Sequence, residues 1–274
     1  MNRLIDDRRP RRRLSPRRIA ALLAGVVLSS VAIDACFVEP DAVALESIGW
    51  PAKVRSPLVI AHLSDLHANG YGLREERAIA MIEAARPDVV VVTGDVVDGG
   101  TLEPARAFFE KLHAPLGVLV VRGNWEQWRP VADEAAFYGQ VHATLLVNRG
   151  LEVRDDVWVA GLSDESTTAP DLGAALLGKP EGAVTVGLFH SPAYFEQASS
   201  RLDVAFAGHT HGGQIRVPGL PPLFLPRGSG RFVSGDYTVG RSRMHVSRGL
   251  GTSIVPIRFA CKPEVAIVTL IPTP

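Results

Sequence analysis

A chain of 274 residues is long enough for one large domain with a well-buried core, and its hydrophobic fraction of 46% and charged fraction of 21% are ordinary for a globular protein. Its formal net charge of zero hides an asymmetry, because residues 1–18 hold eight arginines and two aspartates, whereas the remainder has 21 basic and 27 acidic residues. The two cysteines, Cys36 and Cys261, are too far apart in the sequence to indicate a disulfide framework, and neither suggests a metal site.

An apolar run follows the arginine-rich tail at 1–18 and predicts a membrane segment. Residues 19–33 carry no charge, and apolar residues resume after Asp34. About twenty residues cross a hydrocarbon core, so Ile19–Val38 is predicted to be a single transmembrane anchor. The arginines before it place the N-terminus in the cytoplasm and the rest of the chain outside. A signal peptide cleaved at Ser30-Val31-Ala32 is the alternative.

Strands and helices alternate along the chain, beginning with one strand inside a predicted linker at 39–57. The interpretation rests on short β-branched runs that end in turn residues, and on apolar residues at helical spacing. The predicted elements are strand 43–48, strand 58–64, helix 74–85, strand 89–93, helix 102–112, strand 117–121, a hairpin of 143–148 and 152–161 around Arg149-Gly150, helix 171–177, strand 184–189, helix 192–199, strand 204–207, strand 244–247 and strand 265–271.

Side chains of metal-ligand type directly follow the predicted strands, where open α/β sheets place their sites. His209 and His211 are one residue apart in a glycine-flanked loop, so their rings point to different sides and suit two separate ions. Each residue alone is a common turn residue, but their recurrence at separate strand ends predicts a site. Oxygen and imidazole ligands suit Mn²⁺, Fe or Zn²⁺. The seven residues are Asp65, His67, Asp95, Asn124, His190, His209 and His211.

Five blocks in this order resemble the calcineurin-like metallophosphoesterase superfamily over about residues 58–271. The blocks read DxH, GDxxD, GN, a single His after a buried strand, and GHxH. HTHGGQIRVPG at 209–219, VSRGLG at 246–251 and PIRF at 256–259 are similar to its membrane-associated bacterial branch. The resemblance implies an α/β fold, a four-layer α-β-β-α sandwich of two mixed sheets. It makes residues 58–274 the metallophosphoesterase domain, behind one N-terminal transmembrane helix.

The resemblance also implies two divalent metal ions that share a hydroxide, which attacks a phosphodiester or diphosphate bond. Asp95 would bridge the ions, and Asp95, Asn124 and His190 are the predicted catalytic residues. The remaining ligands divide into Asp65, His67 and His211 for the first ion, and Asn124, His190 and His209 for the second.

One position departs from the superfamily pattern, which usually reads GNH followed by an acid. Here the residue is Trp125, which donates one hydrogen bond but transfers no proton. Asp98, which orients that histidine in related phosphatases, therefore loses its expected partner. A site without a general acid favours substrates with acidic leaving groups, such as diphosphates or aryl esters. Four other histidines match no block and are expected in the core or at the surface: His62, His113, His142 and His245.

The segment 217–230 carries Leu220, Leu223 and Phe224 directly after the GHxH block. It is either a loop packed on the sandwich or an apolar lip that takes an acyl chain or rests on a bilayer.

The predicted protein is thus a phosphoesterase of the bacterial inner membrane, single-pass, with its catalytic domain on the extracytoplasmic side. Its expected substrate is a phosphorylated small molecule or lipid of the membrane or envelope. One alternative is hydrolysis of UDP-2,3-diacylglucosamine in lipid A biosynthesis, although that substrate is cytoplasmic. A second alternative is a non-catalytic metal-binding scaffold, motivated by Trp125. Nucleic-acid binding by the arginine tail is not expected, because a membrane segment follows it.

Overall fold

The computed structural model describes residues 37–38, 42–165 and 168–273. It comprises two compact units, Met1–Phe37 and Val38–Pro274, and every element below except β1 lies in the second. Residues 19–36 of the predicted anchor, like the arginine tail, lie outside the described residues; its last two residues form strand β1 (Phe37–Val38). In the described ranges no helix combines the length and the apolar character that crossing a bilayer requires.

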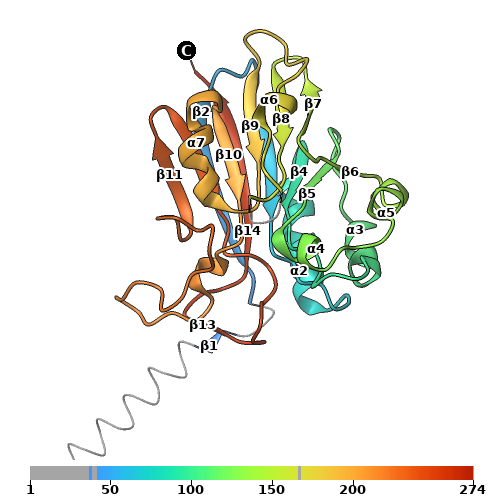
Figure 1. Cartoon of the computed structure of the whole chain (residues 1–274), viewed down its shortest axis with the longest axis vertical. Coiled ribbons are helices and arrows are strands. Elements are labelled where there is room, and N and C mark those ends of the chain that lie inside the picture. The colour runs from blue at the N-terminus through green and yellow to red at the C-terminus, as the bar shows by residue number, and fades with distance from the viewer. Residues whose placement is uncertain (1–36, 39–41, 166–167, 274) are drawn as a thin grey trace, which may run out of the picture. The chain divides into compact units, whose positions relative to one another are not determined.

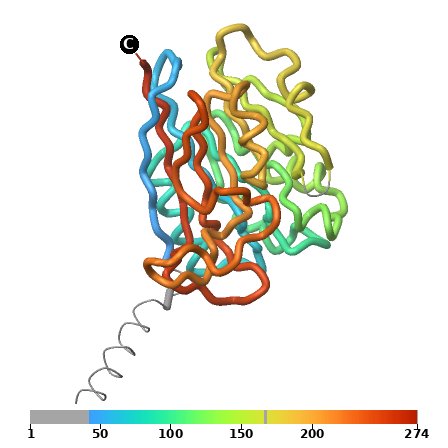
Figure 2. The backbone as a smooth tube through the Cα atoms, turned by 60° about the vertical axis from the view of Figure 1, so that its left-hand side comes forward, coloured from blue at the N-terminus to red at the C-terminus, as the bar shows by residue number. Residues whose placement is uncertain are grey.

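Two six-stranded mixed sheets form the second unit (Figures 1 and 2). In the first sheet the C-terminal strand runs parallel to one neighbour and antiparallel to the other, and the remaining pairs are parallel. Its spatial order is β2 (Ala44–Ala52), β14 (Glu264–Pro272), β3 (Leu58–Leu63), β4 (Val89–Thr93), β5 (Val118–Val121) and β6 (Ala143–Leu145). The order of the second is β11 (Gly235–Val239), β12 (Ser242–Val246), β10 (Val204–Ala207), β9 (Val184–Leu188), β8 (Val157–Gly161) and β7 (Arg149–Arg154).

Helices cover the outer face of each sheet (Figure 1). The helices packed on the first sheet are α2 (Leu73–Ala85), η1 (Glu103–Ala105), α3 (Arg106–Phe109) and α5 (Glu134–Gln140). Those packed on the second are α6 (Leu172–Ala175) and α7 (Phe195–Ala198), the latter flanked by the short turns η2 (Pro192–Tyr194) and η3 (Ser199–Arg201). Two further short helices follow strands, α4 (Asn124–Trp128) after β5 and η4 (His211–Gly213) after β10, and the two-residue strand β13 (Arg258–Phe259) precedes β14.

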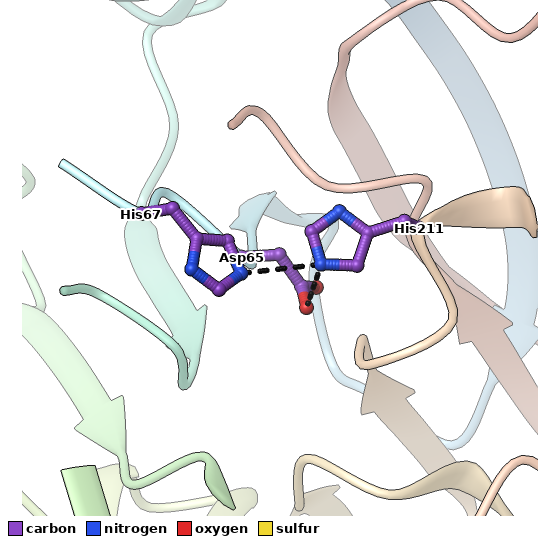
Figure 3. A group of neighbouring side chains, drawn as sticks. All are labelled: Asp65, His67 and His211. Atoms are coloured by element: carbon purple, nitrogen blue, oxygen red, sulfur yellow. Dashed lines mark hydrogen bonds and ion pairs between the residues drawn. The ribbon is translucent and has the colours of Figure 1, made fainter. Parts of the chain in front are cut away.

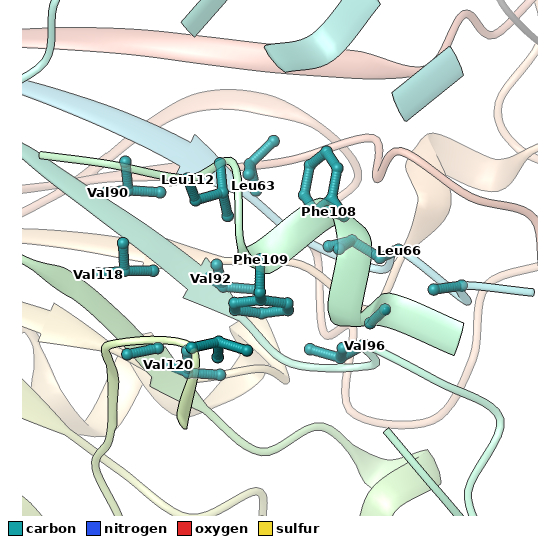
Figure 4. Close-up of a cluster of buried hydrophobic side chains, with 14 of the residues drawn as sticks. Leu63, Leu66, Val90, Val92, Val96, Phe108, Phe109, Leu112, Val118 and Val120 are labelled. Carbon is teal, nitrogen blue, oxygen red and sulfur yellow. The ribbon is translucent and has the colours of Figure 1, made fainter. Parts of the chain in front are cut away.

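Burial on both faces explains why the central strands are continuously apolar. Successive side chains of a strand point to opposite faces. Accordingly, Val90 and Val92 of β4 pack under Phe108 and Phe109 of α3 (Figure 4), while Val91 packs in the core between the sheets. The two mixed sheets of the predicted fold are confirmed, and the helices on both outer faces make four layers.

The predicted hairpin of residues 143–148 and 152–161 is wrong. β6 pairs with β5 in the first sheet, whereas β7 pairs with β8 in the second around a turn at Asp155-Asp156. The chain crosses between the sheets at Leu146, whose side chain is fully buried in the core between them. Strand propensity alone does not say which sheet a short apolar run will join.

The strand predicted at 43–48 within the linker is confirmed as β2, which is longer and extends the first sheet. Nine consecutive residues, Ala44–Ala52, pair in register with Glu264–Pro272 of β14. The helix predicted at 102–112 is shorter and is divided into η1 and α3.

His62 and His245, which match no family block, join the two sheets through a buried polar network. Their Nδ1 atoms lie 3.1 Å apart, and His62 Nε2 lies 2.9 Å from Thr93 Oγ1. On the other side, His245 Nε2 is 3.1 Å from Glu264 Oε1, and the second oxygen of this carboxylate, Oε2, forms an ion pair with Arg248. Burial, followed by the charge of His245, holds the pKa of His62 well below its usual value. His62 is therefore neutral in the folded protein.

We expect the free energy of unfolding to decrease as the pH falls below about 6.5, because the unfolded chain then takes a proton that folded His62 does not. The folded pKa is depressed, so the stabilisation is present above the unfolded value and is lost below it. One proton gives a slope of about 1.4 kcal/mol per pH unit. His62→Gln keeps a polar group of similar size and should reduce this slope, measured by urea denaturation in chelator at about pH 7.5 and about pH 5.5. The matched control is His113→Gln at an exposed position; a slope unchanged in His62→Gln contradicts the assignment.

Candidate metal centre

All seven predicted ligands lie where the carboxyl ends of the strands of both sheets meet. Asp65 and His67 follow β3, Asp95 follows β4 and Asn124 follows β5, all in the first sheet. The ligands from the second sheet are His190 after β9, and His209 and His211 after β10. The parallel alignment of neighbouring strands brings their carboxyl ends to one edge, which is why residues distant in sequence converge.

At Gly208, which follows β10, the second sheet packs directly against the residues that follow β3 in the first. A Cβ at this position would lie 1.8 Å from Ser64 Oγ and 2.3 Å from Asp65 Oδ2, so only glycine fits. The backbone N–H of His209 donates to both carboxylate oxygens of Asp65, at 3.0 and 3.1 Å. This contact fixes the loop of the second sheet against the strand end of the first.

Five of the seven residues adopt a left-handed backbone conformation, which is uncommon for residues other than glycine. Their φ values are 48° for Asp65, 41° for His67, 52° for Asp95, 72° for His209 and 50° for His211. Surrounding backbone hydrogen bonds hold these turns in place. Asp65 N–H donates to Gly94 O at 3.0 Å, and His67 N–H donates to Asp95 O at 3.0 Å. Such strain concentrates at functional sites, where neighbouring structure imposes it.

Asp65, His67 and His211 form the first group, with their polar atoms directed toward one another (Figure 3). The Nε2 atoms of the two histidines are 3.2 Å apart, and His211 Nε2 lies 3.3 Å from Asp65 Oδ1. All three side chains are buried.

Asp95, His190 and His209 form the second group, and Asn124 lies beside it. His190 Nε2 is 3.1 Å from each of three atoms: Asp95 Oδ2, His209 Nδ1 and Asn124 Oδ1. The same Asp95 oxygen is 3.8 Å from His67 Nε2 of the first group. Asp95 therefore lies between the two groups.

These separations fit divalent cations. Two ligand atoms that are each 2.0–2.2 Å from one ion, at angles between square and tetrahedral, lie about 3–3.5 Å apart. The four shortest separations within the groups, 3.1–3.3 Å, fall in this range. His211 Nδ1 is buried without a hydrogen-bond partner among the described residues. The mixture of carboxylate, amide and imidazole matches the chemistry of Mn²⁺, Fe and Zn²⁺.

The electrostatics of both groups favour positive charge. Burial lowers the pKa of His190, but the charge of Asp95 and the hydrogen bond to it raise the pKa well above its usual value overall. Burial likewise lowers the pKa of His67, while Asp98 and Asp95 outweigh it and raise the net value. By contrast, burial and then the charged neighbouring histidine lower the pKa of His209 and of His211. The carboxylates that raise the pKa of one histidine in each group would also attract a cation.

A ring of outer contacts orients the histidines. His190 Nδ1 donates to Thr93 O at 2.7 Å, and His209 Nε2 donates to Arg227 O at 2.6 Å. His67 Nδ1 lies 2.5 Å from Asp98 Oδ1, so Asp98 has a partner, although a different one from the histidine that Trp125 replaces. The Trp125 ring is perpendicular to that of His67, with centroids 6.0 Å apart. Such contacts fix which ring nitrogen faces an ion.

Two supporting residues were missed from the sequence. The buried carboxylate of Glu126 accepts the backbone N–H groups of Asp95, Val96, Val97 and Gly123. Burial, followed by the charge of Asp95, raises the pKa of Glu126 to about 7. Glu126 occupies the position of the acid that follows GNH in the superfamily pattern, so that pattern could have identified it as a supporting residue.

Arg258, in the PIRF block, is the second. Its buried guanidinium donates to the carbonyl oxygens of Arg248 at 2.8 Å and of Gly249 at 3.1 Å, in the loop that carries the VSRGLG block. In that loop, Gly251 N–H donates to Asp65 O at 2.7 Å. Arg258 therefore supports the position of Asp65.

Comparison with known proteins agrees with this geometry. The family model described as calcineurin-like phosphoesterase matches residues 58–213, more than half of the chain. The chain belongs to the calcineurin-like phosphoesterase family. It is 30% identical to the metallophosphoesterase YkuE of Bacillus subtilis over 77% of this chain and 78% of that protein. It is 27% identical to the phosphodiesterase YaeI of Escherichia coli over 79% of this chain and 83% of that protein.

A third relative is named as a transmembrane protein with a metallophosphoesterase domain. This bovine protein is 27% identical to the chain, over 93% of this chain and 62% of that protein. Membership of the phosphoesterase family supports a metal-dependent hydrolase of phosphoester bonds, and the two His/Asp groups could hold its metal ions.

Proposed function

We propose that the chain is a two-metal hydrolase of phosphodiester or diphosphate bonds, with the seven residues named above as its ligands. One observation carries this proposal: two buried His/Asp groups lie side by side, and a single Asp95 oxygen is 3.1 Å from a histidine of one and 3.8 Å from a histidine of the other. Asp65, His67 and His211 would hold one ion; Asn124, His190 and His209 would hold the second. Asp95 would contact both.

Two cations in these groups would supply positive charge for the phosphoryl oxygens and lower the pKa of an attacking water. The chain contributes the positioning. Thr93 O and Asp98 hold the rings of His190 and His67 in fixed orientations. Glu126 holds the backbone of Asp95, and Arg258 supports the loop bonded to Asp65. A site organised before the substrate binds does not need to rearrange during the reaction.

The substrate class follows from Trp125. Its indole cannot protonate a leaving group, so the site suits phosphoesters whose leaving group is already acidic. A diphosphate or an aryl diester meets this condition. The name of the relative YaeI, a phosphodiesterase, is consistent with the diester. A more specific alternative is hydrolysis of UDP-2,3-diacylglucosamine, in which the bond broken is also a diphosphate.

The proposal is tested with the purified full chain and bis-p-nitrophenyl phosphate. Hydrolysis should require Mn²⁺, Fe²⁺ or Zn²⁺, stop in chelator and return when metal is restored, and elemental analysis should find about two ions per chain. Metal binding without hydrolysis of this diester or of a nucleoside diphosphate sugar supports the scaffold alternative and contradicts the hydrolase.

We expect Trp125→His to widen the range of leaving groups. A histidine at this position can donate a proton, and general acid catalysis contributes about 10²–10⁴-fold where the leaving group is basic. The turnover of a dialkyl phosphodiester, in which either leaving group is a basic alkoxide, should therefore rise about tenfold or more relative to bis-p-nitrophenyl phosphate. Trp128→His, at the adjacent exposed indole 6.0 Å away, is the matched control. An equal ratio in both variants argues against proton donation from position 125.

A further inference from the structure

Two loops beside the metal centre, the first containing residues 217–224 and the second residues 254–257, expose an unusual concentration of apolar side chains. They carry seven of the fourteen large hydrophobic residues exposed in the described part of the chain. We name them together the apolar surface: Val217, Leu220, Leu223, Phe224, Ile254, Val255 and Ile257. The first loop includes the lip predicted from the sequence, and the second was not predicted. Single exposed apolar residues are normal, but a contiguous group marks a contact surface.

Hydrogen bonds join the two loops into one surface. Gln214 donates through Nε2 to Ser253 O at 3.1 Å and to Val255 O at 2.9 Å, and accepts at Oε1 from Ser253 N–H. Arg216 N–H donates to Phe259 O at 2.9 Å. Figures 1 and 2 show both loops, orange and red, at the lower end of the domain. One of the two alternatives for the first loop was that it packs on the sandwich. The side chains of Leu223 and Phe224 do not do so, since each residue is 69% exposed.

The backbone also presents an apolar residue to solvent at a conformational cost. Ile254 is 88% exposed and has φ of 65°, a left-handed conformation that is a true outlier for a β-branched side chain. Its neighbours on both sides are held by Gln214. Strain of this kind indicates a functional constraint on the loop.

The charged residues within the two loops are all basic. Residues 208–232 and 247–263 contain no aspartate or glutamate. They contain six basic residues, of which Arg231 and Arg248 form ion pairs and Arg258 is buried. The others are Arg216, Arg227 and Lys262. Apolar side chains framed by basic ones match a bilayer with anionic headgroups.

The path of the chain favours a bilayer over other partners. β2 begins at Ala44, whose N–H donates to Pro263 O at 2.8 Å, directly after the second loop. The uncharged run that ends at Ile33 is only eleven residues earlier in the sequence. Eleven residues span at most about 40 Å, so a membrane that holds this run stays within reach of the loops.

We propose that the apolar surface contacts a phospholipid bilayer and opens the metal centre toward it. The first loop reaches the centre directly, since Arg227 O accepts from His209 Nε2. A phosphoester carried by a lipid would then enter from the membrane face; this substrate class, unlike the docking itself, rests on the proposed function.

The test of docking uses the full chain reconstituted in vesicles of phosphatidylcholine and phosphatidylglycerol. Phe224→Trp adds an indole to the surface, and Leu177→Trp adds one at a position that is 76% exposed in a loop after α6. The fluorescence of the wild type is subtracted from that of each variant to isolate the added indole. Lipids brominated on the acyl chain should then reduce the fluorescence of the indole at 224 at least about twofold, and should leave the fluorescence of the indole at 177 unchanged. Equal quenching overturns the proposal. So does a Trp at 224 that is shielded from acrylamide but not quenched by brominated lipid, which indicates coverage by protein.

A second measurement keeps docking separate from catalysis. The double variant Leu223→Ser and Phe224→Ser should lower the ratio of turnover on a diacylglycerol-bearing aryl phosphodiester to turnover on bis-p-nitrophenyl phosphate by about tenfold, because weaker docking limits access only to the lipid. Leu177→Ser is the matched control. An unchanged ratio rejects entry from the membrane face. If the wild type hydrolyses neither compound, the proposed function fails, and the quenching result still decides docking.

Discussion

Asp95→Asn should reduce hydrolysis of bis-p-nitrophenyl phosphate by at least about 10³-fold. Removing one preorganised electrostatic group from an active site costs about 10²–10³-fold, and Asp95 would be shared by two ions. Its Oδ2 is 3.1 Å from His190 Nε2, and its Oδ1 accepts from Trp125 N–H at 2.9 Å. Asparagine keeps one oxygen but replaces the other with an N–H₂ group and removes the negative charge that attracts the cations.

The control for this variant is Asp133→Asn. Both aspartates have left-handed backbones, with φ of 52° and 53°, and asparagine tolerates this conformation. Asp133 is exposed and lies at the start of α5, so its substitution should leave both activity and metal content unchanged. Elemental analysis should find fewer ions bound to Asp95→Asn. Retention of more than about a tenth of wild-type activity in Asp95→Asn would show that Asp95 is not shared by two ions.

Glu126→Ala should produce the largest loss of stability, about 3–5 kcal/mol in the free energy of unfolding. The carboxylate accepts four backbone N–H groups at 2.6–3.1 Å, and no other acceptor replaces it when the side chain ends at Cβ. Each unsatisfied buried donor costs about 1–3 kcal/mol, reduced where water enters the cavity. Because two of these groups belong to Asp95 and Gly123, metal affinity should fall together with stability.

The comparison is with Glu110→Ala, at an exposed position at the end of α3, which should change stability by no more than about 0.5 kcal/mol. Glu126→Gln should fall between the two variants, since its amide retains one oxygen as an acceptor but directs N–H₂ at the remaining donors. Urea denaturation in the presence of chelator measures the intrinsic stability, and metal titration measures the affinity. A Glu126→Ala protein within about 1 kcal/mol of wild type contradicts the anchoring role.

The strands that carry the site are predictable from the sequence because their signal is local. Val89–Thr93 and Val204–Ala207 are short apolar runs closed by a glycine, and the structure assigns them the predicted bounds. The candidate ligands follow such runs, so the rule that sites form at strand carboxyl ends was enough to group them. Their division into two groups came from the family resemblance.

The remaining features depend on contacts between distant segments. Leu146 turns the chain from one sheet into the other, and its own sequence neighbourhood is equally compatible with a hairpin. Glu126 is visible in the sequence as one acid, whereas its role arises from N–H groups of residues 95–97 and 123. Likewise, the loop of Ile254 is held beside the chain that leads to Leu223 and Phe224 because Gln214 bonds to the backbone of Ser253 and Val255.

The position of the last strand has a consequence for biosynthesis. β14 lies between β2 and β3, so β3, whose end carries Asp65 and His67, has an open edge until residues 264–272 have left the ribosome. A nascent chain that already contains all seven candidate ligands still lacks β14, the strand that pairs with β3 beside Asp65 and His67. Hydrolytic competence should therefore arise only after residues 264–272 have been synthesised, and a stop codon that removes β14 should yield an inert polypeptide.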